Sequence, residues 1–352
     1  MRKTGLVWDP LFERHLEHVE HPENAARLRS IYRRLRESGL DHKTIQLPIR
    51  PALDEEILLI HTSDYLETVR SKAGAHYEQL DPDTLMTEAS FEAALAAAGS
   101  GIDLVDAIFD GALDNGFALI RPPGHHARAG HGMGFCIFNN AAIAAEHLVR
   151  RHNLERVAIV DFDIHHGNAT NESFYERSDV LYCSTHQSPF YPYTGKASEI
   201  GHGAGEGYSI NIPMEPHTED DAFFLTYERI ILPILESYQP QFLIVSAGYD
   251  VHRKDLLGSM NISTECIEAL CRLLINAADH YCGGRVAFFL EGGYDYMETL
   301  ADCVEVTVNA LRGTKPNSRP MQCDLSNAAF RDILITARHY LGAHWGCLYD
   351  EA

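Results

Sequence analysis

Short apolar, β-rich runs separated by longer amphipathic stretches dominate the chain after residue 116. The runs predicted as strands are Phe117–Ile120, Val157–Val160, Val180–Cys183, Ser209–Ile212, Phe242–Val245 and Val286–Leu290. Helical patterns lie between several of these runs, at Ala141–His152, Ala222–Tyr238 and Thr264–Tyr281. Continuous apolar strands that alternate with helices are typical of a mostly parallel sheet covered on both faces. The pattern therefore predicts an α/β fold.

The first 115 residues show a mainly helical pattern instead. In the segment 21–38, Leu28, Ile31 and Leu35 fall on one helical face. The Ala-rich segment 90–111 predicts a buried helix that is closed by Gly111. Because no linker separates the halves, we expect a single domain over 1–352. It would consist of a core over about 1–313 and a C-terminal extension, 314–352, whose helix near 328–341 packs on that core.

Composition and charge narrow the class of protein. Hydrophobic residues make up 45% and charged residues 22% of the 352 positions, which excludes a disordered, collagenous or coiled-coil chain. The formal net charge of −21 argues against direct binding of nucleic acid or of anionic membranes. The cluster of arginines between positions 27 and 36 is interpreted as the solvated face of a helix.

The N-terminal sequence MRKTGLVWDP lacks the apolar stretch of a signal peptide, and no run reaches the 18 apolar residues of a membrane span. The 8 cysteines are scattered without a CxxC pair, which indicates reduced and mostly buried thiols. These features predict a cytoplasmic protein that does not associate with membranes. Histidine is the compositional outlier, because many of the 20 histidines concentrate between positions 121 and 186.

Each predicted strand of the central part leads into residues with catalytic or ligand chemistry. The segments that follow are RPPGHHA at 121–127, DFDIHHGN at 161–168, STH at 184–186, SAGYD at 246–250 and EGGYD at 291–295. In an open parallel sheet, ligands bind outside the carboxyl ends of the strands. These strand ends together therefore predict one shared site.

A metal site is indicated by Asp163, His165 and Asp250. The first two are two positions apart, so at a strand end both side chains project to the same side. Asp250 follows a different strand and could complete an Asp/His/Asp ligand set. Three protein ligands leave a coordination position open, as in catalytic zinc sites, although this set also suits Fe²⁺. Alternatively, Asp163 and His165 cap the following helix or form a buried ion pair.

Acid–base chemistry is indicated by His125 and His126, which follow two prolines and a glycine. Such a stiff turn fixes the backbone direction, so both rings can face the same small volume. The near-neutral pKa of imidazole suits proton transfer during hydrolysis by a metal-activated water. Asp161 is a natural partner for one ring and Asn168 for the other. The alternative for the histidine pair is an exposed polar loop.

Aromatic residues near these motifs complete the candidate site. Tyr294 follows two glycines and could donate a hydrogen bond to a developing oxyanion, or it could be an ordinary turn tyrosine. Phe135, after Gly134, is either a core aromatic or one wall of a channel. Candidates for the opposite wall are Phe190 and Tyr191. The histidines interpreted as structural, hydrogen-bonded residues are His131, His166 and His186.

Taken together, these motifs resemble the histone deacetylase family, which includes acetylpolyamine amidohydrolases and bacterial homologues. The matching stretches are HPENAARL, LDPDT, RPPGHHA, GFCIFNN, DFDIHHGN, SAGYD and EGGYD, which span nearly the whole chain. The resemblance implies an arginase-like, three-layer α/β/α fold around a mostly parallel sheet of about eight strands.

The resemblance also implies roles for individual residues. His126 would act as general base and acid with His125 as its electrostatic partner, while Tyr294 would polarise the acetyl carbonyl. The residues that would hold zinc are Asp163, His165 and Asp250. A potassium ion is implied near Asp161, Asp163, His165, Ser184 and Thr185. The substrate-binding residues would be Asp83, Gly134, Phe135, Phe190, Tyr191 and Leu257, with Asp83 as a rim aspartate.

Two positions bear on the branch of the family and on the substrate. Asn168 stands where the nuclear class I branch usually has aspartate, and asparagine is common there in the class II branch. The segment HxxDxLG at 252–258 also resembles the class II branch. Leu257 falls about where the polyamine-selective eukaryotic branch has a glutamate. We therefore expect a deacetylase that acts on acetyl-lysine in proteins. The alternatives are an acetylpolyamine or other small acetylamide as substrate, and a non-catalytic regulator; homo-oligomer formation stays open.

Overall fold

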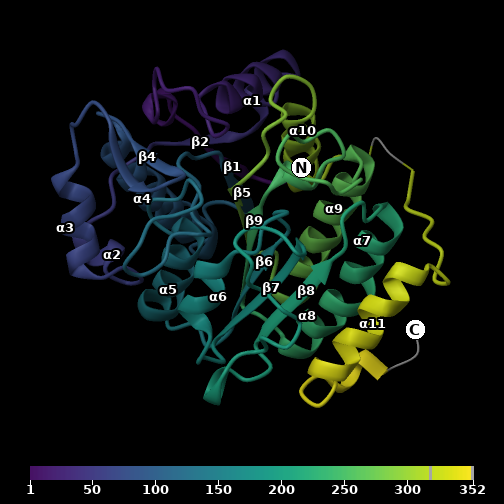
Figure 1. Cartoon of the computed structure of the whole chain (residues 1–352). Helices are drawn as coiled ribbons and strands as arrows, with labels where there is room; N and C mark the ends of the chain where they lie inside the picture. Colours follow the sequence, from purple (N-terminus) through teal and green to yellow (C-terminus); the bar gives the residue numbers. More distant parts are fainter. Residues whose placement is uncertain (317–318, 350–352) are drawn as a thin grey trace.

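In the computed structural model, an eight-stranded, fully parallel sheet forms the centre of the protein. Figure 1 shows helices around this sheet. The structure describes residues 1–316 and 319–349, so residues 317–318 and 350–352 of the expected C-terminal extension lie outside the described residues. In spatial order the strands are β2 (Ile45–Leu47), β1 (Thr4–Val7), β5 (Asn115–Ala118), β10 (Val286–Leu290), β9 (Phe242–Ala247), β6 (Val157–Asp161), β7 (Val180–Gln187) and β8 (Ser209–Met214). A separate antiparallel hairpin joins β3 (Glu78–Asp81) to β4 (Thr84–Met86).

Helices cover both faces of this sheet. They are α1 (Ala26–Glu37), α2 (Asp54–Ile57), α3 (Ser63–Ser71), α4 (Ser90–Phe109), α5 (Asn140–His152), α6 (Asn168–Phe174), α7 (Asp220–Thr226), α8 (Leu232–Tyr238), α9 (Thr264–Tyr281), α10 (Leu300–Leu311) and α11 (Ala328–Leu341). On one face, α4 and α5 pack together against the central strands. On the other face, α1, α10, α9 and α8 lie in sequence. The three-layer α/β/α architecture expected from the sequence is confirmed.

The central strands are buried along their whole length because helices cover both faces of the sheet. Every residue of β5, β6, β9 and β10 is buried. Burying one Val, Leu, Ile or Phe side chain contributes roughly 1.5–3 kcal/mol, so these strands supply much of the driving force for folding. Their apolar runs are also the reason why the sequence pattern locates them well.

The interpretation of the first 115 residues as mainly helical is incomplete, because β1 and β2 form one edge of the central sheet. These strands have only 4 and 3 residues, and Ile45 is 46% exposed, so they lack the long apolar run of a central strand. Smaller differences concern boundaries. The strand expected at 117–120 is β5 at 115–118, and the residues STH lie inside β7. A π-helical turn at Tyr227–Ile231 separates α7 from α8 within the expected helix 222–238.

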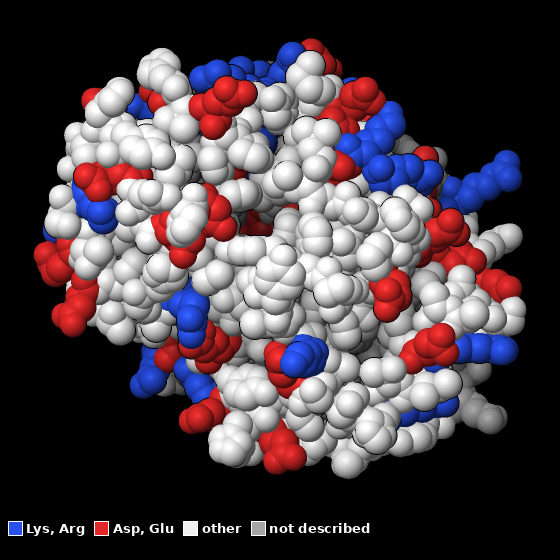
Figure 2. All heavy atoms as spheres, viewed as in Figure 1, with Lys and Arg blue, Asp and Glu red and all other residues white. Residues whose placement is uncertain are grey.

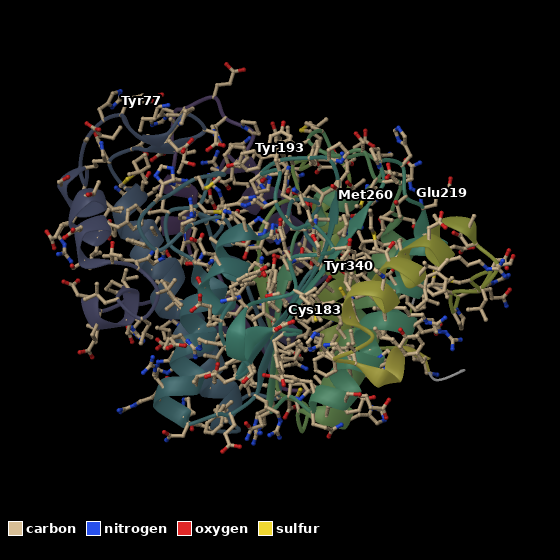
Figure 3. The ribbon with its side chains drawn as sticks, turned by 60° about the horizontal axis from the view of Figure 1, so that its bottom comes forward. Tyr77, Cys183, Tyr193, Glu219, Met260 and Tyr340 are labelled. Carbon is tan, nitrogen blue, oxygen red and sulfur yellow. The ribbon has the colours of Figure 1, made fainter. Side chains whose placement is uncertain are left out.

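The C-terminal helix α11 packs on α7 and on the edge strand β8. Figure 3 shows this helix in yellow, with Tyr340 on it, alongside the green helices. Trp345, just beyond α11, donates a hydrogen bond of 2.7 Å to the backbone oxygen of Gly207. The assignment of the whole chain to a single domain stays a prediction. Within the described residues, every helix is too short or too polar to cross a lipid bilayer.

The order of the strands positions the functional region. From β6 the chain moves outward to β7 and β8, whereas from β9 it moves in the opposite direction to β10. The neighbouring strands β6 and β9 therefore flank a topological switch point, where a crevice opens at the carboxyl ends of the strands. Asp163 and His165 follow β6, and Asp250 follows β9.

Candidate active site

The three residues predicted as metal ligands meet at this switch point. One ligand atom from each of Asp163, His165 and Asp250 lies within 4.8 Å of the other two. His165 Nδ1 lies 3.0 Å from Asp163 Oδ1 and 3.2 Å from Asp250 Oδ2. All three residues are buried or nearly so, since the His165 side chain is 12% exposed and the two carboxylates are at most 1% exposed. The arrangement forms a compact carboxylate–imidazole–carboxylate group.

This group has the properties of a cation site. Asp250 Oδ2 is buried and accepts no hydrogen bond, although it lies close to His165. The other carboxylate oxygens are held by the backbone, with Ile164 N–H donating to Asp250 Oδ1 and Gly292 N–H donating to Asp163 Oδ2. Burial and the neighbouring Asp163 charge raise the pKa of Asp250 to about 7. A divalent cation would satisfy the free oxygen and relieve the repulsion, so the donor set fits a metal ion.

Two glycines make room for these carboxylates. A Cβ atom on Gly248 would overlap the Asp163 carboxylate, and one on Gly292 would lie 2.6 Å from Asp163 Oδ2 and overlap Asp250 as well. The glycines of SAGYD and EGGYD are therefore required by the close approach of backbone and ligand side chains.

The adjacent histidines have different partners. His125 Nδ1 lies 3.0 Å from Asp161 Oδ2, whereas His126 Nδ1 lies 2.7 Å from the amide oxygen of Asn168. Burial lowers the pKa of His125, but the charges of Asp161, Asp163 and Glu291 outweigh this effect and raise it to about 10. For His126, burial and the positive charges of His125 and His165 hold the pKa well below its usual value. These effects favour the neutral form of His126, which is the form that can accept a proton.

The predicted substrate-binding residues line one cavity of about 250 Å³. Its walls are Asp83, His126, Gly134, Phe135, His165, Phe190, Tyr191, Leu257 and Tyr294. The Phe190 ring stacks on His165 at 5.1 Å between centroids, and the Phe135 ring meets Tyr294 edge-on at 5.9 Å. Figure 2 shows a hollow near the middle of the face that is turned toward the viewer, with acidic atoms inside it. The cavity is thus a pocket with aromatic walls, and it is lined by His126 and by one of the three ligand residues, His165.

The sequence and the fold are both similar to those of known proteins. The histone deacetylase domain model matches residues 21–311. The chain belongs to the histone deacetylase family. Its sequence is 40% identical to the chloroplastic histone deacetylase 14 of Arabidopsis thaliana, over 83% of this chain and 73% of that protein. It is 37% identical to a histone deacetylase-like amidohydrolase of Pseudomonas aeruginosa, over 94% of this chain and 87% of that protein.

Other histone deacetylase relatives extend the comparison to substrate and structure. The human polyamine deacetylase HDAC10 is 36% identical, and the match covers 100% of this chain and 52% of that protein. The crystal structure of the HDA15 HD domain superposes with a TM-score of 0.90 at 33% identity, covering 99% of this chain and 97% of that one. The chain is therefore an enzyme of the deacetylase and amidohydrolase type, in a family that is generally metal-dependent.

Asp83 supports the cavity wall from the β3–β4 hairpin. Its Oδ1 accepts a hydrogen bond of 2.9 Å from Gly134 N–H. Gly134 and Phe135 both have positive φ angles, +56° and +69°, and this strained turn brings the Phe135 ring to the pocket. The hairpin and the turn are thus joined at the cavity of this deacetylase.

The other predicted site residues lie nearby. Asp161 and Ser184 are direct neighbours across β6 and β7, and the Thr185 hydroxyl bonds to Tyr227. A potassium ion at these residues stays a prediction. The histidines interpreted as structural do have hydrogen-bond partners. His131 pairs with Asp81, His166 with Thr194, and His186 with Ser184 and Gly195.

Sequence reasoning missed Glu291, the first residue of EGGYD. Its Oε2 accepts hydrogen bonds from the backbone N–H groups of Gly124 (2.7 Å) and His125 (3.2 Å). Burial raises the pKa of Glu291 to about 7, with the charge of Asp161 adding to the effect and that of His125 opposing it. This carboxyl group ties the loop that carries Tyr294 to the turn that carries the histidine pair.

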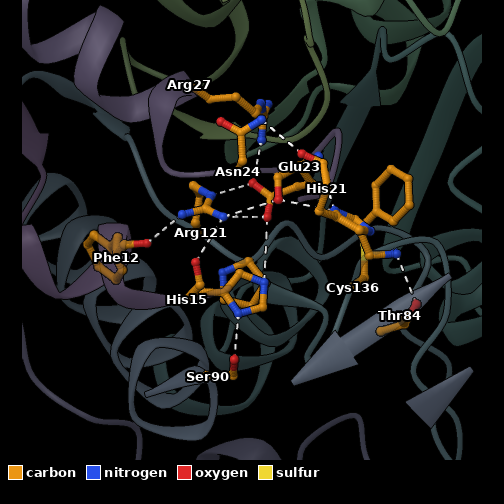
Figure 4. A network of polar contacts seen from close by, with 12 residues as sticks. Phe12, His15, His21, Glu23, Asn24, Arg27, Thr84, Ser90, Arg121 and Cys136 are labelled. Carbon is orange, nitrogen blue, oxygen red and sulfur yellow. Dashed lines mark hydrogen bonds and ion pairs between the residues drawn. The ribbon is translucent and has the colours of Figure 1, made fainter. Parts of the chain in front are cut away.

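Sequence reasoning also misjudged Arg27, which is fully buried rather than on a solvated helix face. Figure 4 shows Glu23 between two arginines, Arg27 and Arg121. Arg27 donates to the backbone oxygen of Gly293 at 2.6 Å and lies 5.0 Å from the centre of the Tyr294 ring. The spacing of the buried Leu28, Ile31 and Leu35 would have placed Arg27 next to the buried face, and that signal was available in the sequence.

A substitution at Gly292 tests the metal site independently of catalysis. We expect Gly292→Ala to lower the affinity for a divalent cation roughly 10- to 100-fold, because its Cβ displaces both ligand carboxylates. The measurement is metal content by mass spectrometry after dialysis, with circular dichroism as the check on folding. Gly346→Ala is the matched control, since a Cβ there meets no atom within 4 Å. Unchanged metal affinity in a folded Gly292→Ala protein would show that the ligands lie elsewhere.

Proposed function

We propose that this enzyme is a zinc-dependent deacetylase that hydrolyses the acetyl amide of acetyl-lysine in proteins to lysine and acetate. The observation that carries the proposal is the convergence of three groups on one narrow pocket. These groups are an open three-ligand set, a neutral imidazole at His126 and the phenol of Tyr294. The pocket's aromatic walls suit an aliphatic chain, and its base suits an amide carbonyl.

The ligand set Asp163, His165 and Asp250 would hold the ion. A bound Zn²⁺ supplies Lewis acidity, polarising the carbonyl and bringing the pKa of water from 15.7 toward roughly 7. Each remaining step belongs to the protein. Phe135 and Phe190 enclose the methylene chain and exclude bulk water, which strengthens the electrostatic interactions at the reacting carbonyl.

Proton transfer is assigned to His126. Its neutral ring accepts the proton of the attacking water and later donates it to the departing amine. Asn168 holds Nδ1 of this ring and so leaves Nε2 as the atom that exchanges the proton. His125, paired with Asp161, keeps a positive charge beside the ring, which favours the oxyanion and hinders early protonation of His126.

Oxyanion stabilisation is assigned to Tyr294. Burial is the main cause that raises the pKa of this phenol well above its usual value, and the charges of Asp250 and Asp163 add to the effect. The positive charge of Arg27 opposes it. The hydroxyl therefore stays protonated and can donate a hydrogen bond to the tetrahedral oxyanion. Arg27 and Glu291 support catalysis indirectly. Arg27 binds the backbone of the loop that carries Tyr294, and Glu291 in that loop binds the backbone of the turn that carries the histidine pair.

Protein acetyl-lysine is favoured over acetylpolyamine by one feature of the pocket. The side chain at 257 is leucine, so this wall offers no carboxylate to a secondary ammonium, and the Asp83 carboxylate that also lines the cavity already accepts a hydrogen bond from Gly134 N–H. The named relatives include both protein and polyamine deacetylases, which makes the acetylpolyamine reaction the second candidate.

A substrate panel tests the proposal directly. The zinc-loaded enzyme should deacetylate an acetyl-lysine peptide with a higher kcat/KM than N-acetylspermidine, and a hydroxamate should block both reactions. A higher kcat/KM for N-acetylspermidine would contradict the assignment to protein acetyl-lysine and support the acetylpolyamine reaction. Failure to release acetate from every acetylamide, on protein of full metal content, would contradict the hydrolase assignment.

The substitution Tyr294→Phe tests the role of the Tyr294 hydroxyl as the hydrogen-bond donor to the oxyanion. We expect kcat to fall on the order of 10²- to 10³-fold, because the variant loses one preorganised hydrogen bond to the transition state. Metal content should stay at the wild-type level, since the phenol is not a ligand. Single-turnover kinetics with an acetyl-lysine peptide measures the effect, and full turnover by the variant would overturn the role of Tyr294.

Asn168→Asp tests the proton carrier. A carboxylate at this position adds negative charge 2.7 Å from His126, so it should raise the pKa of that ring by about one unit or more. Because only the neutral ring accepts the proton, the acid limb of the kcat/KM profile should move to higher pH by the same amount. Asn276→Asp, on the exposed side of α9, is the control and should leave the profile in place. An unmoved acid limb in Asn168→Asp would exclude His126 as the base.

A further inference from the structure

A second group of metal-ligating side chains joins the helices α4 and α5. His147 Nε2 and His152 Nε2 lie 2.8 Å and 2.6 Å from the same carboxylate oxygen, Asp106 Oδ1. Candidate ligand atoms of the three residues all lie within 4.8 Å of one another. None of the residues that line the catalytic cavity belongs to α4 or α5, so this group is separate from the site described above.

The local structure holds the three side chains in place. Asp106 and Phe109 are three positions apart on α4 and so share one face of that helix. The Phe109 ring packs on the His152 imidazole at 4.0 Å between centroids, which fixes the orientation of that ring. The side chains of Asp106, His147 and His152 are 34%, 12% and 15% exposed, so an ion can reach them from solvent.

We propose that Asp106, His147 and His152 form a second binding site for a divalent transition metal, with Zn²⁺ as the preferred ion. Two imidazoles and one carboxylate are ligands that suit zinc, and they leave a fourth position for water. The bound ion would connect the last turn of α5 to α4. Its role is therefore to fasten these helices together rather than to take part in amide hydrolysis.

The observed distances are compatible with such an ion. Zinc ligands about 2.0–2.1 Å from the metal in tetrahedral geometry are separated by about 3.3 Å. The Nε2–Oδ1 distances of 2.6 and 2.8 Å would therefore have to increase by about 0.7 and about 0.5 Å. The partly exposed side chains permit this movement. To bind zinc through Nε2, each neutral imidazole must carry its hydrogen on Nδ1, so the Nε2 hydrogen that each ring now directs at Asp106 would be exchanged for one on Nδ1.

The experiment counts zinc on the full-length chain. Metal-free protein is titrated with Zn²⁺ at micromolar concentration, and bound zinc is measured by equilibrium dialysis and mass spectrometry. We expect two zinc ions per chain in the wild type and one in His147→Gln/His152→Gln, whose deacetylase activity should be unchanged. His280→Gln/His339→Gln, which removes two histidines outside the group, should still bind two.

Two results would overturn the proposal. One is an equal number of zinc ions in the wild type and in His147→Gln/His152→Gln, and the other is binding of the second zinc only at millimolar concentration. Either result would mean that Asp106 joins the helices through hydrogen bonds alone. Zinc-dependent thermal stabilisation of an Asp250→Asn protein provides a second measurement, because that variant lacks a catalytic ligand but retains the α4–α5 group. Loss of this stabilisation when the two glutamines are added would support the site.

Discussion

Buried negative charge is the constraint on which the active site depends. Four carboxyl groups, those of Asp161, Asp163, Asp250 and Glu291, are at most 1% exposed, and they follow or end the three adjacent strands β6, β9 and β10. Such a concentration of like charge in a protein interior is unfavourable unless positive charge accompanies it. His125 and a divalent cation held by Asp163, His165 and Asp250 would supply that charge, so metal binding and the stability of the sheet's carboxyl edge are linked.

The same charge distribution shifts the pKa values of the adjacent His125 and His126 in opposite directions. His125 faces a carboxylate, which favours its charged form, while His126 faces an amide and two positive neighbours, which favour its neutral form. In the proposed mechanism, one short turn thus presents an electrostatic stabiliser and a base side by side. The difference comes from the carboxylates of Asp161, Asp163 and Glu291 around His125 and from the positive charges of His125 and His165 around His126.

The turn and the tyrosine loop are held by a buried network that begins near the N-terminus. Glu23 pairs with Arg121 of the turn and with Arg27, which binds the loop of Tyr294. Burial opposes ionisation of Glu23, but the two arginines outweigh it and keep its pKa below the usual range. Loss of one partner would leave a buried charge uncompensated, so this network couples catalytic geometry to folding.

The sequence by itself determined the fold class, the central strands and the strand-end motifs, because long apolar runs report burial on both faces and the chemistry follows them directly. It also marked Asp163, His165, His126 and Tyr294 by residue type and spacing. Only the tertiary structure decided that β1 and β2 complete the sheet, and that Glu291 and Arg27 support the site. Short edge strands and buried ion pairs depend on partners far away in the chain, and a local pattern carries no record of which distant residue will satisfy a charge.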